Sequence, residues 1–214
     1  MSCVNQMKQI MMGIHNYYET YHSFPPAYTI DSNGQPLHSW RVLILPHLGE
    51  ENLYKQIRLD EPWDSEYNKQ FHSQMPDIFC CPSMKQADSV FSALKEQHHN
   101  LEIGCCYSIV IGKETPFPGS ESTQPESIDD KENTVLIVER MVPVNWMNPM
   151  SDMLFETASC GVNAELTGIG STHHGGCNCA MADAGVKFIA DSIETSILKE
   201  MLKLKKDKNL NENR

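Results

Sequence analysis

The chain has 214 residues, of which 40% are hydrophobic and 21% charged, a composition typical of a globular protein with one domain. Its formal net charge of −11 argues against a nucleic-acid partner, because no basic face can dominate a phosphate backbone at that balance. No apolar run is long enough to span a membrane, and the first residues lack the pattern of a signal peptide.

The N-terminal segment, residues 2–22, is predicted to form one amphipathic helix that packs on a sheet. Ser2 is a suitable N-cap, and the helix should end before Pro25, because the residue before a proline avoids the helical region. Apolar residues recur at alternating steps of three and four, which places them on one stripe: Val4, Met7, Met11, Ile14, Tyr18 and Tyr21.

The middle of the chain is predicted to consist of short elements joined by turns. Asn33-Gly34 suits a tight reversal. Residues 39–45 are compatible with a strand or with the first turns of a buried helix, since periodicity does not separate the two. We expect a short amphipathic segment at residues 50–57, a loop at 60–65 and a helix at 65–71 that Asp64 or Ser65 caps. A short strand is expected at 78–81 and a polar, partly helical stretch at 83–100.

Strands are predicted to dominate the second half of the chain. Residues 134–139 have the strongest β-branched content, and an edge strand that tolerates Pro143 is expected at residues 142–146. A further buried strand is expected at residues 104–111, and two long loops are expected at residues 112–131 and 148–170.

The C-terminal part is predicted to form a hairpin and a helix. In the first strand Asn178, Ala180 and Ala182 alternate with Cys179, Met181 and Asp183, and residues 183–185 provide the turn. Asp191 and Glu194 form a capping-box pattern before the helix. We expect one domain over residues 1–205 and a disordered tail at 206–214. Successive strands without regular βαβ alternation favour an α+β fold with an antiparallel sheet.

The eight cysteines allow 105 disulfide pairings, so the sequence does not select one. We expect buried free thiols that act as small apolar residues, with one or two disulfides as the alternative. The spacing of Cys177 and Cys179 lacks the gap of two to four residues typical of zinc knuckles.

Several motifs follow one another along the chain, and the last is a pair, His173 and Asp183, with nine residues between them. The motifs before it are Cys3-Val4-Asn5-Gln6-Met7-Lys8-Gln9-Ile10, His15-Asn16-Tyr17-Tyr18, Ser23-Phe24-Pro25-Pro26-Ala27, Leu37-His38-Ser39-Trp40-Arg41-Val42-Leu43-Ile44-Leu45-Pro46-His47-Leu48, Leu59-Asp60-Glu61-Pro62-Trp63-Asp64-Ser65, Cys81-Pro82-Ser83, Asp130-Lys131-Glu132-Asn133-Thr134, Val138-Glu139 and Val144-Asn145-Trp146-Met147. In these motifs and their order the chain resembles a large bacterial family of prepilin-like proteins of unknown function, named for a C-terminal His-x9-Asp-Gly signature and also labelled as a solute-binding-like domain.

The chain also departs from the family pattern. Ala184 stands where the signature has glycine, and Gly185 follows one place later. We expect either a turn shifted by one residue or a conformation of Ala184 that does not need glycine. Members of the family typically carry a prepilin leader and a membrane helix, which are missing here. A trimmed chain is one explanation, and a cytosolic relative without an anchor is the other.

The resemblance implies a pilin-like helix packed on an antiparallel sheet, with long loop insertions, a closing hairpin and a C-terminal helix. It also implies a cell-envelope, extracytoplasmic location, or a cytoplasmic one if Met1 is the true start. The partners would be other pilin-like subunits or a type II secretion-like apparatus, reached through the missing N-terminal helix. No nucleophile elbow, phosphate loop or dinucleotide motif is present, so we do not expect an enzyme.

Two groups of residues are candidates for binding. His173, His174, Asn178 and Asp183 offer polar side chains around the hairpin, and the two histidines with Asp183 could form a small polar or metal site. The alternative for them is structural, with a histidine bonded across the hairpin and Asp183 accepting backbone N–H groups in the turn. A second group consists of loop tryptophans and acidic residues: Trp63, Trp146, Asp60, Glu61 and Asp64.

The second group predicts a ligand rather than a resident cofactor. Trp63 and Trp146 could stack on a carbohydrate, although a tryptophan that anchors a loop is the alternative; Trp40 is predicted to be core. Asp60, Glu61 and Asp64 could bind calcium, but their spacing matches no EF-hand. The sequence therefore leaves two hypotheses, a non-enzymatic pseudopilin-like structural protein and an envelope-displayed module that binds carbohydrate or another solute.

Overall fold

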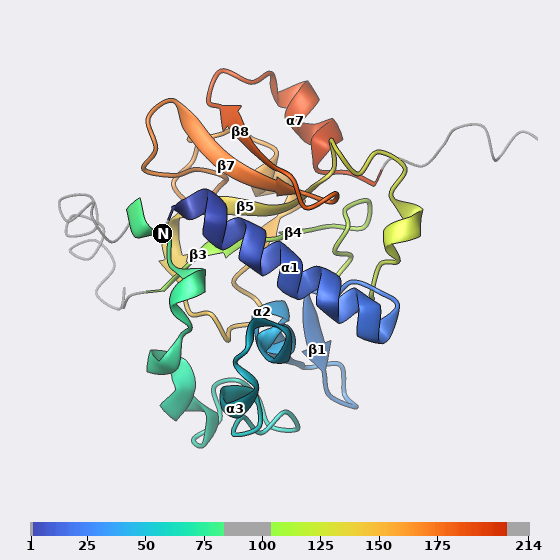
Figure 1. Ribbon diagram of the computed structural model, residues 1–214, viewed down its shortest axis with the longest axis vertical. Helices are drawn as coiled ribbons and strands as arrows, with labels where there is room; N and C mark the ends of the chain where they lie inside the picture. The colour runs from blue at the N-terminus through green and yellow to red at the C-terminus, as the bar shows by residue number, and fades with distance from the viewer. Residues whose placement is uncertain (1, 84–103, 205–214) are drawn as a thin grey trace, which may run out of the picture.

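The computed structural model describes residues 2–83 and 104–204 and has a mixed α+β fold, as the sequence predicts. Helix α1 (Cys3–Tyr21) runs diagonally across an antiparallel sheet whose strand order is β3-β5-β7-β8 (Figure 1). These strands are β3 (Cys105–Ser108), β5 (Val135–Val144), β7 (Gly176–Met181) and β8 (Val186–Ala190). The predictions for the polar stretch after Ser83 and for the tail at 206–214 lie outside the described residues.

Short elements surround this sheet. Two small sheets pair β1 (Tyr28–Ile30) with β2 (Pro36–Ser39) in antiparallel fashion, and β4 (Val110–Ile111) with β6 (Met153–Leu154) in parallel. The helical turns are α2 (Trp40–Leu43), η1 (Leu45–Leu48), α3 (Glu51–Tyr54), η2 (Asn68–Gln74), η3 (Asp77–Phe79), η4 (Pro125–Ser127), α6 (Phe155–Ala158) and α7 (Thr195–Met201). No helix within the described ranges is both long enough and apolar enough to cross a bilayer.

Helix α1 begins and ends as its sequence predicts. The hydroxyl of Ser2 accepts a hydrogen bond from the backbone N–H of Asn5, and His22 closes the helix in the left-handed conformation. The apolar stripe is correct in its middle, where Met7 and Ile14 are fully buried, and wrong at its end, where Tyr21 is 57% exposed. Alternating steps of three and four drift around a helix of 3.6 residues per turn, so a stripe that long leaves the buried face.

The sheet is covered on both faces. Along β7, Ala180 packs into the apolar cluster beneath α1, whereas Cys179 and Met181 pack into a second cluster that contains Leu198 of α7. This alternation confirms the predicted strand, because successive side chains of a strand point to opposite faces. Since both faces are covered, all six residues of β7 are buried.

Four local predictions need correction or a decision. The run 39–45 is helical after Ser39, which ends β2, because Trp40 begins α2 and Leu45 begins η1. Residues 78–81 do not form a strand; η3 follows Pro76, whose fixed φ suits the start of a helical turn. Residues 142–146 are no separate edge strand, because β5 continues to Val144. The final helix begins after Glu194, without the expected capping box at Asp191.

Pro143 is accommodated in β5 by an irregular register. Val144 pairs with Cys105 and Glu139 pairs with Tyr107, so five steps along β5 correspond to two steps along β3. The extra residues bulge out of the ladder, and the missing N–H of Pro143 therefore removes no regular strand hydrogen bond.

The turn between β7 and β8 contradicts both expectations for Ala184. Ala184 itself adopts the left-handed conformation, with φ of 67°, while Gly185 is not among the residues with positive φ. Asp183 stabilises the turn, because its Oδ1 accepts a hydrogen bond of 2.8 Å from the N–H of Gly185. The turn has therefore not shifted, and alanine occupies a position that favours glycine.

Candidate functional site

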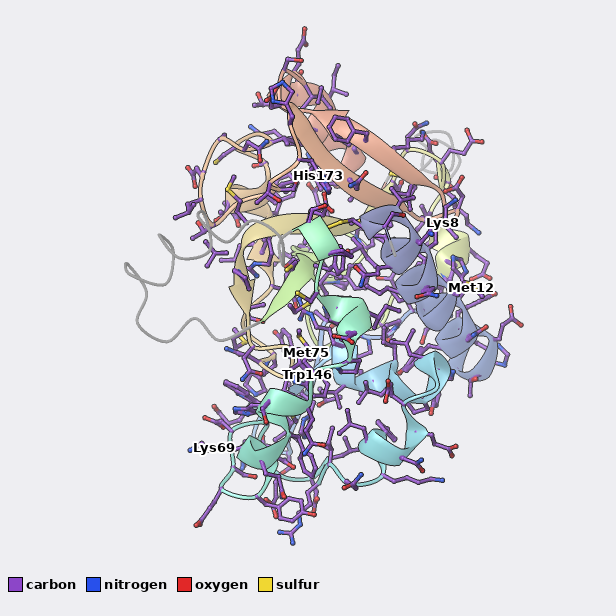
Figure 2. All side chains as sticks on the ribbon, turned by 60° about the vertical axis from the view of Figure 1, so that its left-hand side comes forward. Lys8, Met12, Lys69, Met75, Trp146 and His173 are labelled. Atoms are coloured by element: carbon purple, nitrogen blue, oxygen red, sulfur yellow. A yellow bond between two sulfur atoms is a disulfide. The ribbon has the colours of Figure 1, made fainter. Side chains whose placement is uncertain are left out.

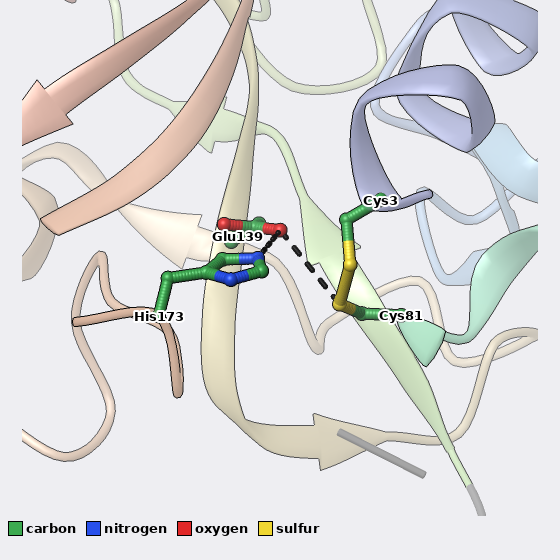
Figure 3. A group of neighbouring side chains, drawn as sticks. All are labelled: Cys3, Cys81, Glu139 and His173. Carbon is green, nitrogen blue, oxygen red and sulfur yellow. Dashed lines mark hydrogen bonds and ion pairs between the residues drawn. A yellow bond between two sulfur atoms is a disulfide. The ribbon is translucent and has the colours of Figure 1, made fainter. Parts of the chain in front are cut away.

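Four side chains with metal-ligating atoms converge beside the first turn of α1 (Figure 3). Cys3 begins α1, Cys81 follows η3, Glu139 lies on β5 and His173 lies in the loop before β7. One ligand atom from each residue lies within 4.8 Å of those from the others. We call this group the Cys3 cluster.

The two cysteines of the cluster form a disulfide across 78 residues of sequence, with their Cα atoms 5.3 Å apart. The sequence-based preference for free thiols is therefore wrong for Cys3 and Cys81. The expectation is correct for five buried cysteines that form no disulfide: Cys80, Cys105, Cys106, Cys177 and Cys179. Cys160 also forms no disulfide, but it is exposed.

Glu139 is a buried carboxylate that lies between Asn178 and the other residues of the cluster. Its Oε2 accepts a hydrogen bond of 2.7 Å from the backbone N–H of Asn178, and the Asn178 amide also donates to it at 3.2 Å. Its Oε1 lies 3.2 Å from Nε2 of His173 and 3.8 Å from Sγ of Cys81. The Asn178 amide also lies 3.3 Å from Oε1, so Asn178 contacts both oxygens, and Oε1 in addition faces His173 and Cys81.

A register shift in β5 determines which way Glu139 points. The pairing of β5 with β7 is irregular between Val135 and Ile137, so Leu136 and Ile137 both pack into the cluster beneath α1. After this shift Val138 faces the opposite cluster, and alternation returns Glu139 to the side of α1.

His173 is positioned by its loop and remains partly open to solvent. Its backbone N–H donates to the hydroxyl of Ser171, which in turn donates to the carbonyl of Gly176. Gly175 takes φ of 78°, a conformation that suits glycine, and turns the chain into β7. The His173 side chain is 24% exposed while that of Glu139 is 2% exposed, so the imidazole forms the outer edge of the cluster.

The four predicted signature residues do not form one site. His173 and Asn178 meet at Glu139, but His174 is exposed and makes no contact that defines the cluster. Asp183 lies beyond the other end of β7, where it stabilises the turn. The sequence reasoning missed Glu139, Cys3 and Cys81, although an acidic residue directly after the apolar run 135–138 was a signal for a buried carboxylate.

The two predicted tryptophans meet at His72, away from the Cys3 cluster. Trp146 is 1% exposed, and its indole N–H donates to the His72 carbonyl at 3.1 Å. Trp63 is half-buried and stacks on the His72 ring with centroids 5.0 Å apart. Figure 2 shows Trp146 well separated from His173, so Trp146 and His173 do not line a common pocket.

The predicted acidic group does not converge on a cation position within the described residues. Asp60 and Asp64 are exposed. Glu61 is held by its neighbours, because Arg58 and the Ser65 hydroxyl each donate to one of its oxygens at 2.8 Å. The hydrogen bond from Arg58 lowers the pKa of Glu61.

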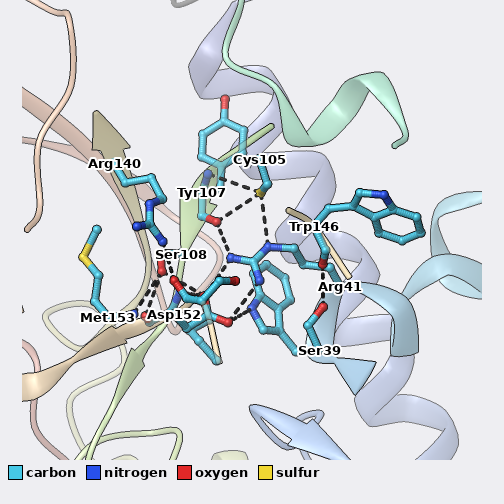
Figure 4. A network of polar contacts seen from close by, with 12 residues as sticks. Ser39, Arg41, Cys105, Tyr107, Ser108, Arg140, Trp146, Asp152 and Met153 are labelled. Carbon is cyan, nitrogen blue, oxygen red and sulfur yellow. Dashed lines mark hydrogen bonds and ion pairs between the residues drawn. The ribbon is translucent and has the colours of Figure 1, made fainter. Parts of the chain in front are cut away.

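A second polar centre, which the sequence did not indicate, fastens α2 to the sheets (Figure 4). Arg41 and Asp152 form a fully buried ion pair, with Nη2 to Oδ1 at 2.7 Å and Nη1 to Oδ2 at 3.0 Å. Trp40, which lies in the core as predicted, and Ser108 also donate to this carboxylate. Burial opposes the charged form of Arg41, but the adjoining Asp152 carboxylate outweighs it and raises the pKa of the guanidinium.

The two centres differ in what they can do chemically. The Arg41–Asp152 pair is enclosed and its donors and acceptors are matched, which is typical of a structural pair. The Cys3 cluster combines two cysteines, an imidazole and a carboxylate, the ligand types that zinc prefers in proteins. In the disulfide form its sulfurs are bonded to each other, so only the imidazole and the carboxylate oxygen are available as ligands.

Comparison with known proteins gives one match. Comparisons with curated proteins and with solved structures found nothing similar. A family model labelled SBP_bac_10 matches residues 1–125 and 113–196, which is most of the chain. The chain therefore belongs to the family described as "Protein of unknown function (DUF1559)".

Proposed function

We propose that this chain is the folded part of a non-enzymatic, pilin-like structural subunit of the cell envelope. The Cys3–Cys81 disulfide carries the proposal. Disulfides persist in oxidising compartments outside the cytoplasm and are rare in the cytosol. That chemistry supports an extracytoplasmic location, as does the resemblance to prepilin-like proteins.

The position of the disulfide supports a structural role for α1. It ties the first turn of α1 to the segment after η3, so that a force applied at the start of the helix passes into the body through a covalent bond. Such an attachment suits assembly through the N-terminal end of α1, as the resemblance to pilin-like subunits implies.

The outer face of α1 is available to other subunits. Lys8 and Met12 lie on the side of the helix that points away from the sheet (Figure 2), and Met12 is 62% exposed. A large exposed apolar side chain on an otherwise polar helix face is a suitable contact for a neighbouring copy.

Labelling of that face tests both the location and the assembly. The variant Met12→Cys is made in a Cys160→Ser background, which removes the exposed free thiol. In cells producing the whole gene product, with a permeabilised outer envelope and an intact inner membrane, we expect an impermeant maleimide to label the introduced thiol. Mild oxidation should then cross-link neighbouring copies.

The control is the Cys160→Ser parent, whose remaining free cysteines are buried among the described residues and should stay unlabelled. Labelling that requires lysis of the inner membrane would contradict the extracytoplasmic location. Labelling with the inner membrane intact but without cross-linked copies would contradict assembly through this face.

A ligand-binding module is the second candidate, because a groove lies beside α1. It has a volume of about 350 Å³ and is bordered by Gln9, Met12, Asn16, His47, Leu48, Glu50, Pro76, Asp77 and Ile78. That volume is at the lower end of the range for small-molecule sites. A thermal-shift screen with calcium, zinc and oligosaccharides tests this function, and no shift with any of them would count against it.

A further inference from the structure

We propose that Cys3, Cys81, Glu139 and His173 bind one Zn²⁺ when the disulfide is reduced. The same two sulfur atoms would then have two alternative uses, a covalent bond to each other or coordination of the metal. This inference concerns the cluster alone and does not rest on the proposed envelope role.

The distances in the cluster suit a tetrahedral zinc site. Zinc bonds of about 2.0–2.3 Å place neighbouring tetrahedral ligand atoms about 3.3–3.8 Å apart. Oε1 of Glu139 lies 3.2 Å from Nε2 of His173 and 3.8 Å from Sγ of Cys81, so two edges of the tetrahedron are already present. Cleavage of the S–S bond frees the sulfurs to separate to about 3.8 Å, the edge between two thiolate ligands.

The surroundings of Glu139 favour coordination through one oxygen. Asn178 donates its backbone N–H to Oε2 at 2.7 Å, which orients the carboxylate so that Oε1 faces His173 and Cys81. The Asn178 amide reaches Oε1 only at 3.3 Å. Hydrogen bonds of this kind orient metal ligands in known sites. The carboxylate is therefore positioned before any metal arrives.

Charge and access favour the same conclusion. Glu139 is 1% exposed, and its ion-pair partner among the described residues is His173, which carries charge only when protonated. A buried carboxylate without a cation is costly, and a divalent metal would compensate it. The partly exposed imidazole of His173 provides a path from solvent to the cluster.

The chemistry balances with a dithiol as the reductant. The dithiol transfers two electrons and two protons to the disulfide and becomes a cyclic disulfide itself, leaving two thiols at Cys3 and Cys81. Zn²⁺ then displaces both thiol protons and binds the thiolates, while the neutral imidazole and the carboxylate complete the site.

A second close pair of cysteines, Cys177 and Cys179, is a suitable internal comparison. The sulfurs of Cys177 and Cys179 lie 3.8 Å apart within β7, on the face away from α1. Among the residues that the structure describes, they do not belong to a group of three or more potential ligands. We expect them to bind no metal tightly.

Cobalt titration tests the proposal, because Co²⁺ in a thiolate site has an intense sulfur-to-metal charge-transfer band. We expect the intact protein, reduced with a phosphine, to bind one Co²⁺ with that band and to release it to Zn²⁺, and the oxidised protein to show no band. His173→Ala and Glu139→Gln should each weaken binding by at least about tenfold, and Cys3→Ala/Cys81→Ala should abolish the band. Cys177→Ala/Cys179→Ala and Cys160→Ser serve as controls that keep it.

Three results would overturn the proposal. The first is no charge-transfer band in the reduced wild-type protein. The second is a band that survives in Cys3→Ala/Cys81→Ala, or a Co²⁺ affinity that neither His173→Ala nor Glu139→Gln weakens. The third result concerns a metal-free chain that unfolds when it is reduced. If added zinc does not restore the circular dichroism of the folded protein in that case, the site is contradicted.

Discussion

Removal of the Cys3–Cys81 disulfide should lower the stability of the whole fold by a calculable amount. The bond closes a loop of 78 residues in the unfolded chain. In the chain-entropy treatment, a loop of that length corresponds to about 4.5 kcal/mol at 25 °C. For a chain of this size, about 2–4 °C per kcal/mol gives a fall in Tm of roughly 9–18 °C.

The assay is thermal unfolding followed by circular dichroism in a metal-chelating buffer. Cys3→Ala/Cys81→Ala is the suitable variant, because alanine leaves no unpaired polar atom where both cysteines are buried. Its Tm should fall to that of the reduced wild-type protein, and added reductant should not lower it further. Cys160→Ser, at an exposed free cysteine, is the control and should retain the wild-type response to reductant.

The reasoning is refuted if the double variant melts within about 3 °C of the oxidised wild type, a change of only about 1 kcal/mol. It is equally refuted if the double variant still loses stability on reduction, because another disulfide would then be responsible. The matched pair of measurements separates the entropy of the loop from general effects of the reductant.

Three further predictions concern the turn, the buried ion pair and the histidines. Ala184→Gly should raise the free energy of unfolding by about 0.5–1 kcal/mol in urea titrations. The variant removes the cost of left-handed alanine, about 1–2 kcal/mol, but part of this gain is lost because glycine has more conformational entropy in the unfolded chain. A decrease would contradict the strain at Ala184. Asp152→Asn should cost about 3–5 kcal/mol in the same assay, since it leaves the Arg41 charge buried without its counter-charge, and a cost below about 1 kcal/mol would contradict that role. Burial lowers the pKa of His15, His38 and His47, so the unfolded chain binds more protons and stability should fall as the pH drops below about 6.5. His38→Gln should flatten this slope in melts between about pH 6.5 and 5, above the range of ordinary carboxylates, and an unchanged slope would exclude His38 as a cause.

The pH effect at His38 has a specific structural cause. Its Nε2 lies 2.9 Å from the carbonyl of Glu61, to which it donates, while Nδ1 is buried and has no hydrogen-bond partner. Protonation would add a buried N–H without an acceptor there, so the neutral form is favoured in the folded protein.

Local patterns were sufficient for the main elements of the fold. The spacing of apolar residues located α1, β-branched content located the first part of β5, and the alternation of residues 178–183 located β7. Each of these signals depends on neighbours within a few residues, which is the range over which helix and strand periodicity acts. Short apolar runs such as 39–45 and 78–81 were ambiguous or wrong, because several turns of periodicity are needed to separate helix from strand.

The sequence by itself determined the α+β class, the N-cap at Ser2 and the hairpin around Asp183, because these depend on local spacing and turn chemistry. Only the tertiary structure decided which cysteines pair, since Cys3 and Cys81 meet across 78 residues. It also decided that the signature histidine bonds to Glu139 rather than to Asp183, because β7 separates the two ends of the signature. Such contacts depend on strand register and on the placement of α1, and no short-range pattern in the chain encodes either of them.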